Sequence, residues 1–433
     1  RKCNIMLNKL DQKIKILIIM VVAMVLSYLT WYNFSALLNF IIEDIELSAG
    51  QIGVILSSFQ AGYVLAVLST GWLADQIGEK KIVLISTFGT AVFSTLFAFL
   101  AVDFWSVLIL RLIAGIFCGG IYVPGMSLLS NWFSPEERGK SIGAYIGGLT
   151  FSYAASYFVA PMIAGSYNWQ IGILATSLPA FIAAFLVYRY VEDAPEEIKA
   201  ENSISKQKVE VKQKDIKPAP EGGYKGPALI TFSYIGHMWE LYGFWGWVGP
   251  FMVSVAVAAG YEYVHASVLG GQLASLIILV GAPSVWLMGY ISDKIGRTKT
   301  ILICSIASLS AQFIFGFMHG KSLIITVVLG IWIGFWVIAD SASFSTGMTE
   351  MVTPKIRATS LGIQNSAGFL ITVISPAVFG HVLEYFNNVE NVTFATQWAL
   401  PFATLGLGAL LAPIAAVFLR RNKQSKLMSN GKK

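Results

Sequence analysis

Three ionisable side chains lie inside long apolar stretches of this sequence: Arg111, Glu240 and Asp340. A charge at membrane depth costs several kcal/mol unless it is paired or hydrated, so each is a candidate functional residue. A carboxyl group in a partly dry setting can bind and release a proton near neutral pH, and a guanidinium can hold an anion. These residue types therefore indicate the binding of protons and of a charged solute.

The stretch around Glu240 is the richest in such groups. His237 lies three residues earlier, so the two share a helical face with Phe244, Trp247 and Phe251. The imidazole and the carboxyl group are expected to carry a proton while the aromatic side chains form a wall for an organic substrate. The alternative is a His237 near the end of its helix and an aromatic stripe that only packs.

A second stretch places Trp332, Trp336, Asp340 and Ser343 at helical spacing, and it is expected to form the opposing wall. Asp340 has no partner nearby in the sequence, so protonation is a cheaper solution for it than ionisation. Other side chains are expected to line the same cavity, although packing alone explains any one of them: Tyr28, Trp31, Ser35, Tyr145, Ser152, Gln364 and Asn365.

These side chains are carried by segments long enough to cross a bilayer. The chain has 433 residues, 55% hydrophobic and 12% charged, and a soluble fold of this length could not bury so much apolar surface. Backbone polar groups must be paired in lipid, and segments of about 20 residues are too long for barrel strands, so helices are predicted. Twelve spanning helices are expected, at 15–37, 51–74, 82–101, 105–129, 139–163, 169–190, 227–256, 266–291, 299–318, 322–347, 358–380 and 396–419.

The charges indicate an orientation for these helices. With the N-terminus in the cytoplasm, every Lys and Arg except Arg111 and Lys321 falls in a tail or a cytoplasmic loop. The outer loops carry acidic residues instead, among them Asp103, Glu262 and Glu384. This positive-inside pattern predicts that both termini are cytoplasmic, and it accounts for the net charge of +6 without a nucleic-acid partner.

Residues 191–226 separate the apolar segments of the two halves, are rich in charged residues and prolines, and are expected to form a solvated cytoplasmic linker. The linker divides the chain into an N-terminal bundle of six helices, 1–190, and a C-terminal bundle of six helices with a basic tail, 227–433. A regulatory role for the linker is the less favoured alternative to a simple tether.

The two halves repeat the same motifs at nearly one offset. The segment Gly71–Gly78 returns as Gly289–Gly296, and Pro135–Gly143 returns as Pro354–Gly362. Two unrelated markers with a shared offset indicate that both halves are built from one multi-helix unit, as in many transporters.

The Gly-x-Leu-Ala-Asp-x-x-Gly pattern between the second and third helices, its second copy, and Arg111 followed by Gly115 resemble the signature of the major facilitator superfamily. The resemblance implies an all-α membrane protein with 12 transmembrane helices in two six-helix bundles related by pseudo-two-fold symmetry. It also implies alternating access, in which the bundles rock around a central site, and a role for Arg111 in proton coupling or anion contact. The alternative is that Arg111 pairs with polar groups of the helices or extends its side chain toward the membrane surface.

The repeated loops are expected to form a conformational latch. Glycine permits a close helix approach and a turn with positive φ, and an aspartate at a helix end can pair with a basic side chain or with the N-terminus of another helix. Gln76 and Glu79 stand where the family has basic residues, so the first copy is expected to be weaker than the second. The alternative is a helix-end anchor. The predicted latch residues are Gly71, Asp75, Gly78, Gly289, Asp293, Gly296 and Arg297.

The favoured function is a secondary transporter that couples movement of a small anionic or zwitterionic organic solute to protons. A multidrug/proton antiporter is the alternative, because acids and aromatic side chains also suit bulky cations, and a membrane sensor without transport is less favoured. The sequence shows no nucleophile, phosphate-binding or metal-ligand motif, so neither an enzyme nor a cofactor is expected. The protein is expected to act as a monomer in a bacterial inner membrane.

Overall fold

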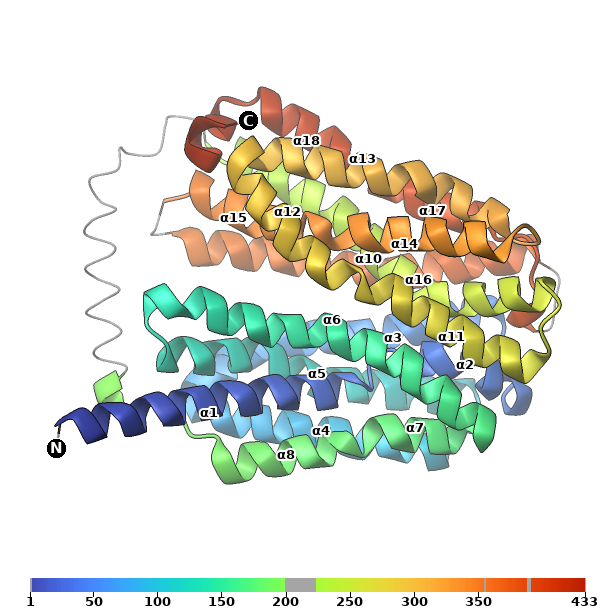
Figure 1. Ribbon diagram of the computed structural model, residues 1–433, viewed down its shortest axis with the longest axis horizontal. Helices are drawn as coiled ribbons and strands as arrows, with labels where there is room; N and C mark the ends of the chain where they lie inside the picture. Colours follow the sequence, from blue (N-terminus) through green and yellow to red (C-terminus); the bar gives the residue numbers. More distant parts are fainter. Residues whose placement is uncertain (1, 199–222, 354–355, 388–390, 433) are drawn as a thin grey trace.

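The computed structural model describes residues 2–198, 223–353, 356–387 and 391–432, and these residues form helices joined by short connections. Figure 1 shows two bundles side by side, with the first half of the chain below and the second half above. The helices of the first half are α1 Lys2–Tyr28, α2 Asn33–Asp44, α3 Ala49–Ile77, α4 Glu79–Leu100, α5 Phe104–Trp132, α6 Pro135–Ser166, α7 Trp169–Ser177 and α8 Pro179–Tyr190.

The second half follows the same plan after the part of the linker that lies outside the described residues. It contains α10 Lys225–Ala258, α11 Tyr263–Leu279, α12 Gly281–Ile295, α13 Arg297–Phe315, α14 Leu323–Ala339, α15 Ser341–Met351, α16 Arg357–Phe386, α17 Ala399–Ala409 and α18 Leu411–Arg421. The described residues of this half also include the 3₁₀ helices η1 Gly316–Met318, η3 Val392–Phe394 and η4 Lys423–Gly431.

Within the described residues, 12 segments are long and apolar enough to cross a membrane, which matches the twelve predicted spans. The first is longer than the predicted 15–37 and covers Gln12–Asp44. It is also broken, because α1 ends at Tyr28 and α2 begins at Asn33. A break at membrane depth frees backbone carbonyl groups, which then need partners from elsewhere in the protein.

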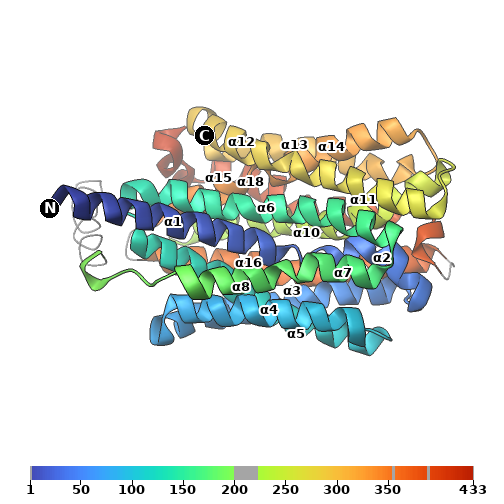
Figure 2. The ribbon, with the colours of Figure 1, turned by 60° about the horizontal axis from the view of Figure 1, so that its bottom comes forward.

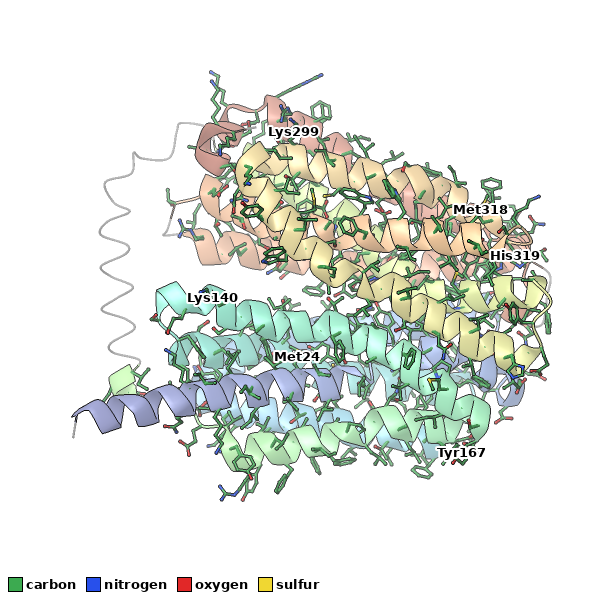
Figure 3. The ribbon with its side chains drawn as sticks, in the orientation of Figure 1. Met24, Lys140, Tyr167, Lys299, Met318 and His319 are labelled. Carbon is green, nitrogen blue, oxygen red and sulfur yellow. The ribbon has the colours of Figure 1, made fainter. Side chains whose placement is uncertain are left out.

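Both chain ends lie at the left of Figure 1, so we call this side the termini end and the other side the opposite end. Figure 3 places Lys140 and Lys299 at the termini end and Tyr167, Met318 and His319 at the opposite end. Lys140 and Lys299, which the sequence assigned to one side of the membrane, therefore lie at the same end of the molecule.

The two bundles meet through two helix pairs, α3 against α16 and α6 against α11, and through α10 against α2. Figures 1 and 2 show α11 lying next to α2 and α6 toward the opposite end. Near the termini end the bundles are apart: Gly143 and Gly147 on α6 and Gly362 on α16 have no neighbouring atom within 4 Å of the place where a Cβ would stand. The site must therefore be sought between a closed end and an open end.

Candidate functional site

The opposite end is closed by direct backbone contact between α3 and α16. A Cβ on Gly53 would stand 2.5 Å from the carbonyl oxygen of Pro376, and one on Gly380 would stand 2.3 Å from the carbonyl oxygen of Ala49. Only glycine permits such an approach, as in other membrane helix pairs. Nearer the helix end, the Glu384 carboxylate accepts hydrogen bonds from the backbone N–H of Gly50 at 2.7 Å and the Ser48 hydroxyl at 2.9 Å. A carboxylate of the second bundle thus caps a helix of the first.

A second cross-bundle contact uses a carbonyl group freed by proline. Pro250 has no N–H, so the carbonyl of Gly246, one turn earlier on α10, lacks its helical partner. The Ser35 hydroxyl of α2 donates to that oxygen. Tyr157 of α6 donates to the neighbouring carbonyl of Trp245 at 2.7 Å. These two hydrogen bonds join α2 and α6 of the first bundle to α10 of the second.

Replacing Gly380 by leucine is expected to open this contact, since the new side chain would displace α3, and overpacking costs about 1–3 kcal/mol. The modification rate of a cysteine at Ser35 by a membrane-impermeant maleimide added at the opposite end should rise by about fivefold or more. The matched control is Gly362→Leu, where the structure offers free space. An unchanged rate for Gly380→Leu, or an equal rise for the control, would contradict the assignment of this contact as the closed end.

Between this closure and the open end lies a cluster of aromatic side chains from both bundles. Trp31 is its centre, with ring centroids 4.5 Å from Tyr63, 5.0 Å from Phe59, 5.4 Å from Tyr153 and 5.5 Å from Tyr28. The second bundle contributes Tyr242, Trp245 and Phe369. Sequence reasoning found Tyr28 and Trp31 but missed the others, because only the packing of the two bundles brings them together.

The cluster encloses a small space next to Arg111. It lies between two constrictions along the α3–α16 pair: the Gly53–Gly380 contact on one side and the Tyr63–Phe369 ring pair, 5.4 Å between centroids, on the other. The volume open to the centre of a water-sized sphere is about 10 Å³, room for about one water molecule. The space is lined by Trp31, Tyr32, Leu56, Phe59, Gln60, Arg111, Tyr242, Gly246 and Pro376.

Arg111 of α5 donates hydrogen bonds to backbone carbonyl groups at the break in the first span. Its Nη1 donates to the carbonyl of Thr30 at 2.8 Å, and its Nη2 donates to the carbonyl of Trp31 at 2.6 Å. The guanidinium also lies over the Phe59 ring, 4.2 Å from the centroid. All of these partners are uncharged, and among the described residues no carboxylate pairs with Arg111, which is only 4% exposed. A buried positive charge therefore stands without a counter-charge beside an enclosed space.

The other predicted ionisable residues gather in a separate place, inside the second bundle. His237 Nδ1 of α10 lies 2.9 Å from Asp340 Oδ1, which stands at the junction of α14 and α15. His237 Nε2 is 3.0 Å from the Ser341 hydroxyl, and Ser308 of α13 donates to Glu240 Oε1 at 2.6 Å. We call His237, Glu240, Ser308, Asp340 and Ser341 the polar core; His237, Glu240 and Asp340 are each less than 5% exposed.

One expectation about these residues is corrected by the structure. His237 was expected to act with Glu240 on its own helix, but it pairs with Asp340, more than a hundred residues away. Asp340 has no partner nearby in the sequence, as expected, and its partner comes from another helix. The sequence could not show this, since the pairing depends on how α14 packs against α10.

The predicted aromatic wall on α10 also faces a different neighbour. Phe244 and Phe251 pack against Phe315 and Phe402 within the second bundle. Trp247 stacks on Phe379 at 4.9 Å and donates to the carbonyl of Pro376. The side chains of α10 that reach the first bundle are instead Tyr242 and Trp245, on the adjoining face.

The remaining predicted liners are dispersed. Trp332 and Trp336 contact each other and lie away from the aromatic cluster, Trp332 being exposed and bonded to the Ala307 carbonyl. Tyr145 donates to the Ile121 carbonyl at 2.8 Å inside the first bundle. Gln364 is buried near the carbonyl of Phe344, whereas Asn365, on the same helix, is exposed.

The two copies of the repeated loop have the backbone that the motif predicts, with φ of 99° at both Gly78 and Gly296. In the second copy, Arg297 Nη1 lies 2.6 Å from Asp293, and Arg297 Nη2 lies 2.8 Å from Glu350 Oε1 on α15. Glu350 also accepts a hydrogen bond from the backbone N–H of Ser429 in η4. Sequence reasoning found Asp293 and Arg297 but missed Glu350.

The first copy has an equivalent arrangement with different charges. Glu79 of the first copy corresponds to Arg297 of the second, and Asn131 corresponds to Glu350. Asn131 donates a hydrogen bond to Glu79 at 2.7 Å. Among the described residues no ion pair involves Asp75, and the backbone N–H of Lys80 is bound by Asp193. Gly71 lies 3.5 Å from Val123 and Gly289 lies 3.8 Å from Ala342, measured from the position of a Cβ, so neither is at a tight crossing.

Replacing Glu350 by glutamine is expected to lower the free energy of unfolding by about 1–3 kcal/mol, because the nearly buried Arg297 would lose a two-point ionic contact. The measurement is thermal unfolding of the purified protein. Glu79→Gln is the matched control, since its partners Ser127 and Asn131 are neutral and an amide oxygen still accepts from them. Equal losses in the two variants would show that the charge of Glu350 contributes nothing.

With this geometry established, comparison with known proteins decides the family. The sequence profile of the Major Facilitator Superfamily matches residues 20–370 and 271–433. The chain belongs to the Major Facilitator Superfamily. It is an integral, multi-pass membrane protein of this class of transporters. The 12 apolar spans of the described residues, arranged in two bundles, confirm the fold class predicted from the motifs.

Proteins named as transporters resemble it along nearly the whole chain. The hexuronate transporter of Bacillus subtilis is 22% identical over 93% of this chain and 95% of its own length. The putative niacin/nicotinamide transporter of the same species is 25% identical over 90% of this chain and 93% of its own. Among solved structures, a bacterial homolog of the human lysosomal transporter Spinster, inward-facing and unoccupied, is similar with a TM-score of 0.75 and 16% identity over 98% of each chain.

Proposed function

We propose that this protein is a secondary transporter of a small organic anion, which moves by alternating access together with protons. The observation that carries the proposal is Arg111, a buried guanidinium that has only neutral partners among the described residues and that lines an enclosed space at the bundle interface. Burying an ion without a counter-charge is costly, and an anionic ligand would supply the missing charge. Hexuronates and niacin, named as substrates of two relatives, both carry a carboxylate.

The polar core is the proposed proton site. A carboxyl group and an imidazole 2.9 Å apart at membrane depth give a proton two adjacent places to bind. Because the polar core lies inside the second bundle and Arg111 lies in the first, protons and substrate would bind to different bundles. Rocking of one bundle against the other then links the two events, as alternating access requires.

The α3–α16 pair supports a two-state mechanism. At the opposite end, Glu384 of α16 caps the N-terminus of α3. At the termini end, Asp75 near the C-terminal end of α3 is exposed, and α16 begins at Arg357. In the second state we expect the Glu384 contact to break and Asp75 to approach the N-terminus of α16. The α3–α16 pair would then close the opposite end in one state and the termini end in the other. The predicted latch would act in this step.

The basic end of the molecule gives the proposed orientation. Lys140 and Lys299 lie at the termini end together with both chain ends (Figure 3), which supports our proposal that this end faces the cytoplasm. The structure then represents a state closed to the outside and open to the cytoplasm. We assign the protein to a bacterial inner membrane and treat residues 1–190 and 227–433 as the two moving units, with 191–226 as their tether.

The test is uptake into proteoliposomes with a panel of radiolabelled carboxylates, with and without an imposed pH gradient. Saturable uptake of at least one carboxylate that increases when the outside is made acidic is the expected result. Uptake that ignores the gradient would overturn proton coupling. Export of cationic dyes without carboxylate transport would favour the multidrug antiporter instead.

A further inference from the structure

We propose that the space beside Arg111 selects an aromatic monocarboxylate, with the carboxylate bound by Arg111 and the ring packed among the aromatic side chains. This inference rests on the proposed function, because it specifies the anion that the transporter takes. It concerns the chemistry of the lining, which excludes some anions and favours others.

The lining offers few groups that could bind hydroxyl groups. Besides Arg111, the hydrogen-bonding side-chain groups around the space are the Gln60 amide, the phenol groups of Tyr32 and Tyr242 and the indole N–H of Trp31; Leu56, Phe59 and Pro376 are apolar, and Gly246 has no side chain. A sugar acid would bring several hydroxyl groups into this lining, and most would lose their hydrogen bonds to water without replacement. A flat hydrocarbon ring loses no such bonds and gains apolar contact.

Three buried polar atoms in the lining are unsatisfied. Arg111 Nε, Gln60 Oε1 and the Tyr32 hydroxyl have no hydrogen-bond partner among the described residues, and all three side chains are more than nine-tenths buried. Arg111 Nε–H is a donor suited to a carboxylate oxygen, and the Gln60 amide can donate after a half-turn about its last bond. A ligand carboxylate would therefore supply the interactions that the protein lacks.

The charge balance sets the number of carboxylates at one. Arg111 contributes a single positive charge, and the described residues of the lining include no lysine and no second arginine. A dicarboxylate would bury its second charge without a partner, which is unfavourable. The lining thus distinguishes benzoate from phthalate, although the rings are the same.

The ring itself would be recognised by stacking and edge contacts. Trp31 and Phe59 lie 5.0 Å apart between centroids, and Tyr242 lies 6.1 Å from Trp31, on the other bundle. Aromatic rings placed in such surroundings gain affinity beyond the area that they bury. Since the present space holds about one water molecule, Tyr63 and Phe369 must part to admit the ring, which would link ligand entry to the movement of the bundles.

The experiment is isothermal titration of the purified full chain with benzoate, cyclohexanecarboxylate, benzamide, phthalate and glucuronate. Benzoate is expected to bind best, about fivefold more tightly than cyclohexanecarboxylate and at least about 30-fold more tightly than the uncharged benzamide. Phthalate and glucuronate are expected to be weaker than benzoate by at least about tenfold. Arg111→Lys should weaken benzoate binding, whereas Arg189→Gln, outside the site, should leave it unchanged.

The outcomes separate this inference from the function on which it rests. Preferred binding of glucuronate or phthalate, lost in Arg111→Lys, would overturn the aromatic selectivity and leave organic-anion transport standing. Equal binding of cyclohexanecarboxylate and benzoate would overturn the ring contribution, and equal binding of benzamide would overturn the role of the charge. If no carboxylate binds and none is taken up into proteoliposomes, both proposals fail.

Discussion

Arg111→Gln is expected to abolish saturable anion uptake, with an apparent affinity lower by at least about 30-fold, which corresponds to about 2 kcal/mol. Among the described residues that line the enclosed space, Arg111 is the only one with a positive charge. Glutamine keeps hydrogen-bonding capacity but removes that charge, and charge-assisted hydrogen bonds are about twice as strong as neutral ones. Uptake kinetics in proteoliposomes provide the measurement.

A structural role for Arg111 must be distinguished from a binding role, since the same side chain satisfies the carbonyls of Thr30 and Trp31. Arg111→Lys keeps the charge but replaces the planar, multi-point donor fork of the guanidinium with a single nitrogen on a shorter reach. If Arg111 only supports the break between α1 and α2, both variants should unfold at lower temperature and transport should fall in proportion. A folded Arg111→Gln protein that still takes up anions with unchanged affinity would refute the binding role.

Asp340→Asn is the second substitution expected to have a large effect. The change removes the carboxylate beside His237 while preserving size, so the pair can no longer exchange a proton within the polar core. Accumulation driven by an imposed difference of one pH unit, which is about tenfold for one proton per anion, should fall to no accumulation. Exchange of labelled for unlabelled substrate at equal pH should continue, because it requires no net proton movement.

The control is Asp103→Asn, at an exposed helix start where asparagine caps as well as aspartate. Glu240→Gln should have a smaller effect than Asp340→Asn, since Ser308 can still donate to an amide oxygen. Should Asp340→Asn retain full pH-driven accumulation, the polar core is not the proton site. Loss of both accumulation and exchange would point to a folding defect, which thermal unfolding would reveal.

The two sites explain why the protein needs two bundles. Arg111 and most of the aromatic cluster belong to the first bundle, whereas the polar core belongs to the second. Tyr242 and Trp245 connect them, since α10 carries His237 and Glu240 on one face and these two aromatic side chains on another. We therefore expect proton binding in the polar core to move α10 relative to α1 and α2, and this movement to change the substrate site beside Arg111.

The sequence alone determined the features that depend on composition and on local spacing. Apolar length defined the spans, the glycine positions of the repeated loops predicted positive φ at Gly78 and Gly296, and the cost of a buried charge singled out Arg111 and Asp340. Each of these follows from a residue and its near neighbours, so no knowledge of packing was required.

Only the tertiary structure decided which of these residues meet. The face of α10 chosen from helical spacing proved to face its own bundle. Helical spacing could not identify the side toward the first bundle, because α10 is buried on nearly all sides between Gly236 and Ala256. His237 and Asp340, Arg297 and Glu350, and Gly53 and Gly380 come from segments distant in the sequence. Their contacts depend on how the helices cross, and a helix surrounded by protein carries no amphipathic signal that would reveal it.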